Sequence, residues 1–204
     1  MTFAWADSRV AFTDAAEWFV RTTAAVGDRW QQPALGEWDV RALVGHTSRS
    51  FLTVETYLAR PAEVVEVASA ADYFRVTRAL AAGPAVAAGG RDAGEALGAD
   101  PTAAVAQIAE RVLQLVEDQD GTALVTTIAG GMRLADYLPT RTFELAVHTA
   151  DLATALAIPP DVPPRPAAQA LGIVGELAAA GGLTGPLLLA ATGRPGLPPG
   201  FSVL

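Results

Sequence analysis

The stretch TRTFELAVHTAD, residues 140–151, decides the fold that this sequence predicts. It contains neither Gly nor Pro, and it follows Pro139, a residue type that is favoured in the first turn of a helix. Apolar side chains recur at helical spacing along the stretch and just beyond it, at Leu138, Leu145, Leu152 and Leu156. We therefore predict a helix that begins around Pro139 and ends near Ile158, before Pro159 and Pro160.

Four ionisable residues share one face of this predicted helix. Glu144 and His148 are four residues apart, so they lie one above the other, and Arg141 and Asp151 lie three residues to either side. A carboxylate and an imidazole one turn apart can bind one metal ion without any backbone movement. A Glu four residues before a His is also a common surface pair, so the spacing alone leaves both interpretations open.

The other histidine of the chain lies in a second apolar helical run. This is His46, within VRALVGHTSRSF at residues 40–51. A polar ring on a largely apolar helix face needs a buried partner. If the two helices face each other, His46, Glu144 and His148 converge as a metal site of two histidines and one carboxylate. The alternative is a hydrogen-bonded histidine in the core or at the surface.

Composition excludes several classes of function. The net charge of -8 and the lack of a basic patch argue against a nucleic-acid partner and against docking on anionic lipid. The chain has no Cys, which excludes disulfides, zinc–cysteine clusters and a protein thiol nucleophile. Any thiol must therefore come from outside the chain. Residues 1–14 lack the pattern of a secretory signal and no apolar run is long enough to span a bilayer, so we expect a cytoplasmic protein without a membrane partner.

Helical periodicity predicts three further long helices. They span about residues 8–26, about residues 39–58 behind a cap at Asp39, and about residues 101–118 behind Asp100. With the helix around residues 140–151 they predict a mainly α fold, a four-helix bundle, in which metal ligands project inward from facing helices. The length of 204 residues suits one such domain with a small appendage.

Shorter elements are predicted between the long helices. Residues 28–38 predict a turn-rich loop whose tryptophans pack across helix ends or form a pocket wall. A helix over about residues 70–82 carries Arg75 and Arg78, which either bind a substrate carboxylate or are solvated surface arginines. Residues 83–98, rich in Gly and Ala, predict a mobile connection.

Two features follow in the second half of the chain. Gly130-Gly131 lies between two short apolar runs, residues 122–128 and 132–135, and this pattern predicts a small β-hairpin with the Gly pair at its turn. A Pro-rich boundary then divides a bundle domain, residues 1–159, from a short C-terminal helical extension packed on it, residues 160–204. Within the extension we expect helices at about 167–180 and 183–191 and a surface tail from residue 193.

Two segments resemble the signatures of a known family. One contains Trp30 and Pro33 and continues as GEWDVRALVGH at residues 36–46, and the other is RTFELAVHTADLA at residues 141–153. Both resemble the mycothiol-dependent maleylpyruvate isomerase family of the DinB/YfiT-like metalloenzyme superfamily, over roughly residues 8–158. The resemblance implies a DinB-like four-helix bundle that binds a divalent metal, usually zinc, through His46, Glu144 and His148.

The expected function is that of a zinc-dependent enzyme, an isomerase or thiol S-transferase, with mycothiol or a similar small thiol as cofactor. Two neutral histidines and one carboxylate leave zinc with a net positive charge and an open position, where an entering thiol loses its proton. The thiolate can add to an electron-poor double bond, allow rotation and leave, or it can transfer to an electrophile. Asp151 can orient His148 or bind the cofactor's amine, and Arg141 can bind a substrate carboxylate; the alternatives are a surface carboxylate and a structural ion pair.

Two other functions stay open. In a metal-dependent hydrolase or cyclase the open position holds water, and in a non-catalytic module the metal is structural. Family membership does not fix the substrate, because the wider group includes both S-transferases and metal-binding proteins of other kinds. The family's isomerases carry a longer C-terminal domain than residues 160–204, so the substrate need not be maleylpyruvate.

Overall fold

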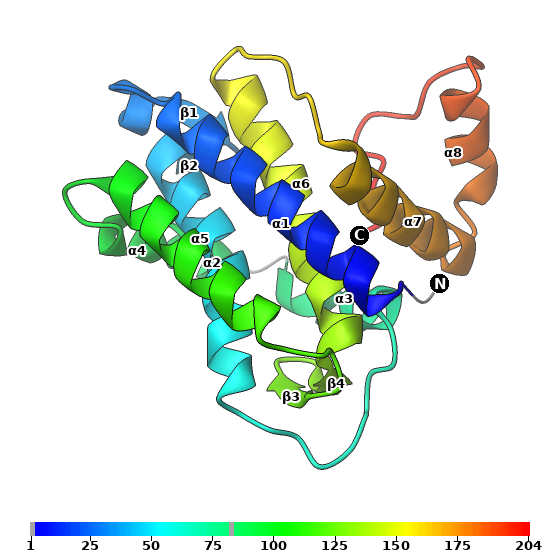
Figure 1. Ribbon diagram of the computed structural model, residues 1–204. Helices are drawn as coiled ribbons and strands as arrows, with labels where there is room; N and C mark the ends of the chain where they lie inside the picture. The colour runs from blue at the N-terminus through cyan, green and yellow to red at the C-terminus, as the bar shows by residue number, and fades with distance from the viewer. Residues whose placement is uncertain (1–2, 82–83) are drawn as a thin grey trace.

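Four long helices form a closed bundle (Figure 1). The computed structural model describes residues 3–81 and 84–204. The bundle helices are α1 (Trp5–Ala24), α2 (Val40–Leu58), α5 (Pro101–Glu117) and α6 (Leu134–Ala155). Helix α1 packs against α5 and α6, and α2 packs against the same two helices. The predicted mainly helical fold is confirmed, and its core lies between these four helices.

Local sequence explains where two of the bundle helices begin. The carboxylate of Asp39 accepts a hydrogen bond from the backbone N–H of Ala42 at 2.8 Å, which caps α2 as predicted. Asp100 caps α5 in the same way through the N–H of Ala103 at 3.0 Å. Helix α1 begins at Trp5, three residues before the predicted start at residue 8, and the buried Ser8 hydroxyl accepts a hydrogen bond from Gln169 at 3.1 Å.

Helix α6 begins earlier than predicted. It starts at Leu134, directly after the second hairpin strand, so Pro139 lies inside the helix rather than in its first turn. A proline there removes the N–H that would bond to the Ala135 carbonyl. The loss of one hydrogen bond is tolerated because the helix is buried on both sides of it: Leu134, Leu138 and Leu145 are fully buried. The extra turns make Leu134 and Ala135 helical, where the sequence predicted a strand.

The predicted hairpin is confirmed, with a different role for its glycines. Strands β3 (Leu124–Thr127) and β4 (Gly130–Arg133) pair antiparallel, and Thr127 faces Gly130, so the connecting residues are Ile128 and Ala129. Gly130 has a φ of 116°, which favours glycine. A side chain at Gly131 would overlap the Val64 carbonyl, so this glycine permits close backbone approach. The Gly pair therefore forms the first two residues of β4 and not the turn.

A second small sheet pairs β1 (Pro33–Leu35) with β2 (Trp38–Asp39) after a short 3-10 turn, η1 (Arg29–Gln31).

The predicted mobile connection is wrong. Most of residues 83–98 forms helix α4 (Pro84–Ala96), which packs along α2. Gly83, and Ala82 at the predicted end of the preceding helix, lie outside the described residues. Gly45 of α2 and Gly94 of α4 face each other, and a Cβ on either would collide with backbone of the other helix. The glycines that weaken the intrinsic preference for helix are therefore the residues that let these two helices meet.

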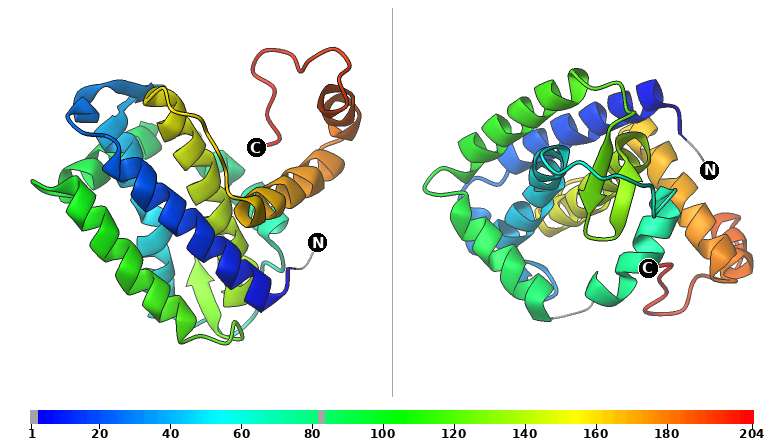
Figure 2. Two further views of the ribbon diagram at one scale, coloured as in Figure 1. Left: turned by 45° about the horizontal axis from the view of Figure 1, so that its top comes forward. Right: turned by 90° about the horizontal axis from the view of Figure 1, so that it is seen from below.

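The remaining helices cover one side of the bundle (Figure 2). Helix α3 (Ala70–Ala81) packs against α6, and α7 (Pro164–Ala180) packs against α1, α3 and α6. Ile173 and Leu177 of α7 join the bundle core, and α8 (Thr184–Ala191) contacts α7. The extension thus packs on the bundle, while its division as a separate domain stays a prediction. Within residues 3–81 and 84–204, every helix is too short or too polar to cross a bilayer.

Candidate metal centre

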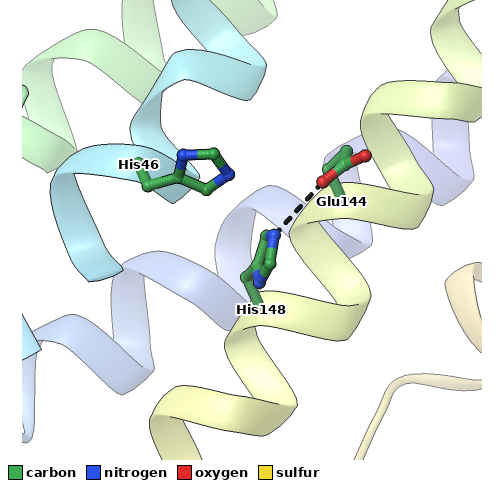
Figure 3. A group of neighbouring side chains, drawn as sticks. All are labelled: His46, Glu144 and His148. Carbon is green, nitrogen blue, oxygen red and sulfur yellow. Dashed lines mark ion pairs between the residues drawn. The ribbon is translucent and has the colours of Figure 1, made fainter. Parts of the chain in front are cut away.

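Helices α2 and α6 bring together the three residues that the sequence singled out. One potential ligand atom from each of His46, Glu144 and His148 lies within 4.8 Å of the other two. Figure 3 shows both imidazole rings and the carboxylate turned toward a common space between the helices. The ring centroids of the two histidines are 5.0 Å apart, and Nε2 of His148 lies 3.2 Å from Oε2 of Glu144.

The two histidines differ in their electrostatic surroundings. Burial, followed by the neighbouring His148, lowers the pKa of His46 to about 4, so this ring is neutral at pH 7. Burial also acts to lower the pKa of His148, but the hydrogen bonds to Asp151 and Glu144 outweigh it and raise this pKa to about 9. Burial acts to raise the pKa of Glu144, but the hydrogen bond from His148 and the charge of Arg141 bring it below its usual value.

Asp151 fixes the orientation of His148. Its Oδ2 lies 3.1 Å from Nδ1 of His148, which leaves Nε2 of the same ring directed at Glu144. A carboxylate behind a histidine in this way sets the tautomer in which Nε2 is free to bind a metal. This geometry corresponds to the orienting role predicted for Asp151.

His46 is held by stacking instead. Trp38, at the start of β2, lies with its ring centroid 4.4 Å from that of His46, and its Nε1 donates to the Ala87 carbonyl of α4 at 3.0 Å. Gly90 of α4 leaves room for the indole, because a Cβ there would lie 2.6 Å from it. Nδ1 of His46 is buried and has no hydrogen-bond partner in the part of the chain that the structure describes. Helix α4 thus positions the tryptophan that covers His46.

The three residues lie in the wall of a cavity of about 630 Å³. Its lining comes mainly from α2, α3 and α6, with Trp38, the hairpin tip and the end of the chain. The described lining residues are Trp38, His46, Arg49, Ser50, Thr53, Tyr57, Tyr73, Phe74, Thr77, Arg78, Val86, Ile128, Arg141, Glu144, His148 and Leu204. A volume of this size is in the range of small-molecule sites.

Two of the three arginines predicted to bind a substrate carboxylate lie at the cavity, and the third does not. Arg141 and Arg78 line the cavity. Arg75 does not line it and instead forms an ion pair on its own helix with Asp72. A structural ion pair was the alternative considered for Arg141, yet none of the carboxylates that the structure describes forms an ion pair with it.

Sequence reasoning missed several lining residues of α2. Ser50, Thr53 and Tyr57 follow His46 at intervals of four, three and four residues, which is the spacing of one helix face. This spacing in the sequence could have predicted a polar stripe on α2 that continues from His46 beside the helix's apolar stripe. Tyr73 had no such signal, because it comes from α3, and only the tertiary structure defines how α3 lies against α6.

Fold and site together define a helical-bundle protein with a candidate metal centre of two histidines and one carboxylate. A comparison with protein-family models matches residues 9–153 to the mycothiol maleylpyruvate isomerase N-terminal domain, so the chain belongs to this family. The predicted resemblance over residues 8–158 is thereby confirmed. No curated protein and no solved structure matches the chain. The family's name points to a mycothiol-related isomerase, which makes an enzyme the expected kind of protein.

Proposed function

We propose that this protein is a zinc-dependent enzyme that activates a small external thiol, such as mycothiol, for isomerisation of an electrophile or for S-transfer to it. The observation that carries the proposal is the convergence of His46, Glu144 and His148 at the wall of a cavity of about 630 Å³. The ring of contacts among the four long helices supports assignment of the bundle to the DinB-like superfamily.

The donor set fits a divalent ion. Two imidazole nitrogens and one carboxylate oxygen match the ligands and the ligand number of catalytic zinc sites, in which a further position stays open. His46 is already neutral at pH 7. The Asp151 hydrogen bond orients His148 so that its Nε2 can bind the ion once this ring gives up its proton, which it holds at pH 7. When bound, such an ion lowers the pKa of a thiol that reaches it, and so supplies a thiolate at neutral pH.

The chain's own residues provide the remaining functions of the site. There is no Cys in the sequence, so the reacting sulfur must enter the cavity with the cofactor. Trp38 packs against the ring of His46, and Asp151 holds the ring of His148 in place. Glu144 is the one carboxylate side chain among the lining residues that the structure describes, and it belongs to the ligand set. This favours thiol chemistry over hydrolysis, which would need a second base beside the site.

Metal analysis of purified variants tests the ligand assignment. The wild type should carry about one zinc per chain by plasma mass spectrometry. We expect His46→Ala, Glu144→Gln and His148→Ala to lose most of it while circular dichroism keeps the helical signal, because the bundle has its own apolar core. Glu55→Gln is the matched control, since Glu55 pairs with Arg111 at the exposed surface. Full occupancy in the three site variants would show that the ligands are wrong.

Turnover tests the chemistry separately. Zinc-loaded protein is incubated with mycothiol and a panel of electrophiles that includes maleylpyruvate, with and without the thiol. Thiol-dependent isomerisation or adduct formation is the expected result. Turnover without thiol would favour a hydrolase or cyclase, and full zinc occupancy without any turnover would favour a non-catalytic metal-binding module.

A further inference from the structure

Helix α4 contributes no ligand to the candidate metal centre, yet it supports the residue that packs on one of the ligands. Trp38 donates from Nε1 to the Ala87 carbonyl of α4 at 3.0 Å. Its indole also lies against Gly90 of α4, where an added Cβ would be 2.6 to 2.8 Å from three indole atoms. The same indole lies 4.4 Å from the ring of His46, centroid to centroid, with the two planes inclined by 34°. Direct contacts therefore connect α4 to His46 through Trp38.

The two histidines of the site are held in different ways. Nδ1 of His148 lies 3.1 Å from Oδ2 of Asp151, whereas Nδ1 of His46 is buried without a hydrogen-bond partner among the described residues. Figure 3 shows one nitrogen of the His46 ring directed toward Glu144 and the other away from it. Histidines that bind metals almost always donate their second N–H to an acceptor, and losing that acceptor weakens metal binding about tenfold to a hundredfold. For His46, the indole of Trp38 takes the place of such a partner.

Helix α4 itself is anchored by little apolar surface. Within residues 85–96 the buried residues are Gly90 and Gly94, and Val86 is half-buried. The helix packs on α2 through backbone contact, since a Cβ at Gly94 would lie 2.8 Å from the carbonyl oxygen of Arg41. An element that buries few apolar side chains opens locally at a lower free energy than the core does. Each opening of α4 removes the support of the indole.

Resting on the metal site of the proposed function, we propose that Trp38 is a positioning residue for His46, and that it couples the docking of α4 on α2 to metal binding. With α4 docked, the indole holds the ring of His46 in the orientation that Figure 3 shows. With α4 open, the ring is free to rotate and the site loses a preorganised ligand. Such coupling is reciprocal, so the ion stabilises docked α4 by the same factor by which docking raises the affinity for the ion.

Two neighbouring glycines of α4 provide the first test. Zinc affinity is measured by competition with a chromophoric chelator. Gly90→Ala pushes a Cβ against the indole and should weaken zinc binding about tenfold to a hundredfold. Gly89→Ala is the matched control with the same gain in helix propensity, and its Cβ would meet only Nη1 of Arg49 at 3.1 Å, the end of a flexible side chain. It should bind zinc as the wild type does. Wild-type affinity in Gly90→Ala would overturn the proposal.

A pair of tryptophan variants separates positioning from general stability. Trp18 of α1 is as buried as Trp38, with exposed fractions of 7% and 8%, and it is absent from the described lining of the cavity. Trp38→Leu should weaken zinc binding about tenfold to a hundredfold, whereas Trp18→Leu should lower the unfolding midpoint and keep the zinc affinity. Equal losses of affinity in both variants, or no loss in Trp38→Leu, would refute the positioning role. If Trp38→Leu does not fold, the comparison of Gly90→Ala with Gly89→Ala decides.

Hydrogen exchange measures the coupling from the other side. Saturating zinc should slow exchange of the amides of residues 86–96 about tenfold or more in the wild type, and this slowing should disappear in Trp38→Leu. A tryptophan with a merely structural role would not change this response to zinc. Exchange in α4 that zinc leaves unchanged in the wild type would overturn the coupling.

The outcomes also separate this proposal from the proposed function. Wild-type zinc affinity in His46→Ala would show that the ligand assignment of the proposed function is wrong. If His46→Ala loses zinc while Gly90→Ala and Trp38→Leu bind it as the wild type does, the ligand assignment stands and only the role of Trp38 is refuted.

Discussion

Replacement of Gly45 by Ala tests the packing of α4 on α2, the contact that sequence reasoning did not foresee. An added Cβ at Gly45 would lie 2.5 Å from the carbonyl carbon of Ala93 and 2.5 Å from Cα of Gly94. Ordinary contact begins at 3.4 Å, so the two helices would have to separate by about 0.9 Å or more. The obstructing atoms are backbone, and no change of side-chain rotamer can relieve the overlap.

The expected cost follows from this overlap. Overpacking of a close contact lowers the free energy of unfolding by about 1–3 kcal/mol, and the higher helix propensity of Ala offsets up to about 1 kcal/mol of this loss. Because the overlap is with rigid backbone, we expect a net loss of about 2 kcal/mol, which lowers the unfolding midpoint of a chain of this length by about 4–8 °C. Since His46 follows Gly45 directly, we also expect weaker zinc binding from the displaced α2.

Differential scanning calorimetry and urea unfolding measure the change in stability. The matched control is Gly175→Ala on α7, where an added Cβ meets nothing within 4 Å. This second change should leave the midpoint unchanged or raise it by a few degrees, because Ala favours helix over Gly. If Gly45→Ala is as stable as Gly175→Ala, then α4 does not lie against α2 at this point, and the placement of Trp38 over His46 fails with it.

Two further predictions concern the metal centre and a helix start. With pKa values of about 9 for His148 and about 4 for His46, the metal-free protein holds one proton on this pair at pH 7. Zinc requires both rings neutral, so binding at pH 7 should release about one proton, and the apparent affinity should fall about tenfold per pH unit as the pH is lowered from about 9 toward 4. Calorimetric heats that do not depend on the ionisation enthalpy of the buffer would contradict this. Asp39→Ala should lower the stability by about 1 kcal/mol in urea unfolding, whereas Asp39→Asn, which keeps a cap, should stay within a few tenths; equal losses in both would show that the Ala42 bond is unimportant.

The sequence by itself determined the long helices and the internal geometry of each one. Apolar stripes and the caps at Asp39 and Asp100 depend only on residues within one or two helical turns, so the local sequence is enough to predict them. The same holds for Glu144 and His148, because four residues along a helix always return to one face. The two signature segments add the family, which the match over residues 9–153 confirms.

Tertiary structure decided what depends on contacts between distant segments. Helix α4 forms in a Gly-rich run of weak helix propensity because its glycines allow it to pack on α2, and Pro139 is accepted inside α6 because the buried helix around it holds the backbone. Arg78 reaches the cavity while Arg75, three residues earlier, is held by Asp72. His46 lies beside Glu144 and His148 only because α2 packs against α6, and Tyr73 lies beside Arg141 only because α3 packs against α6. No local sequence pattern encodes how two helices pack against each other.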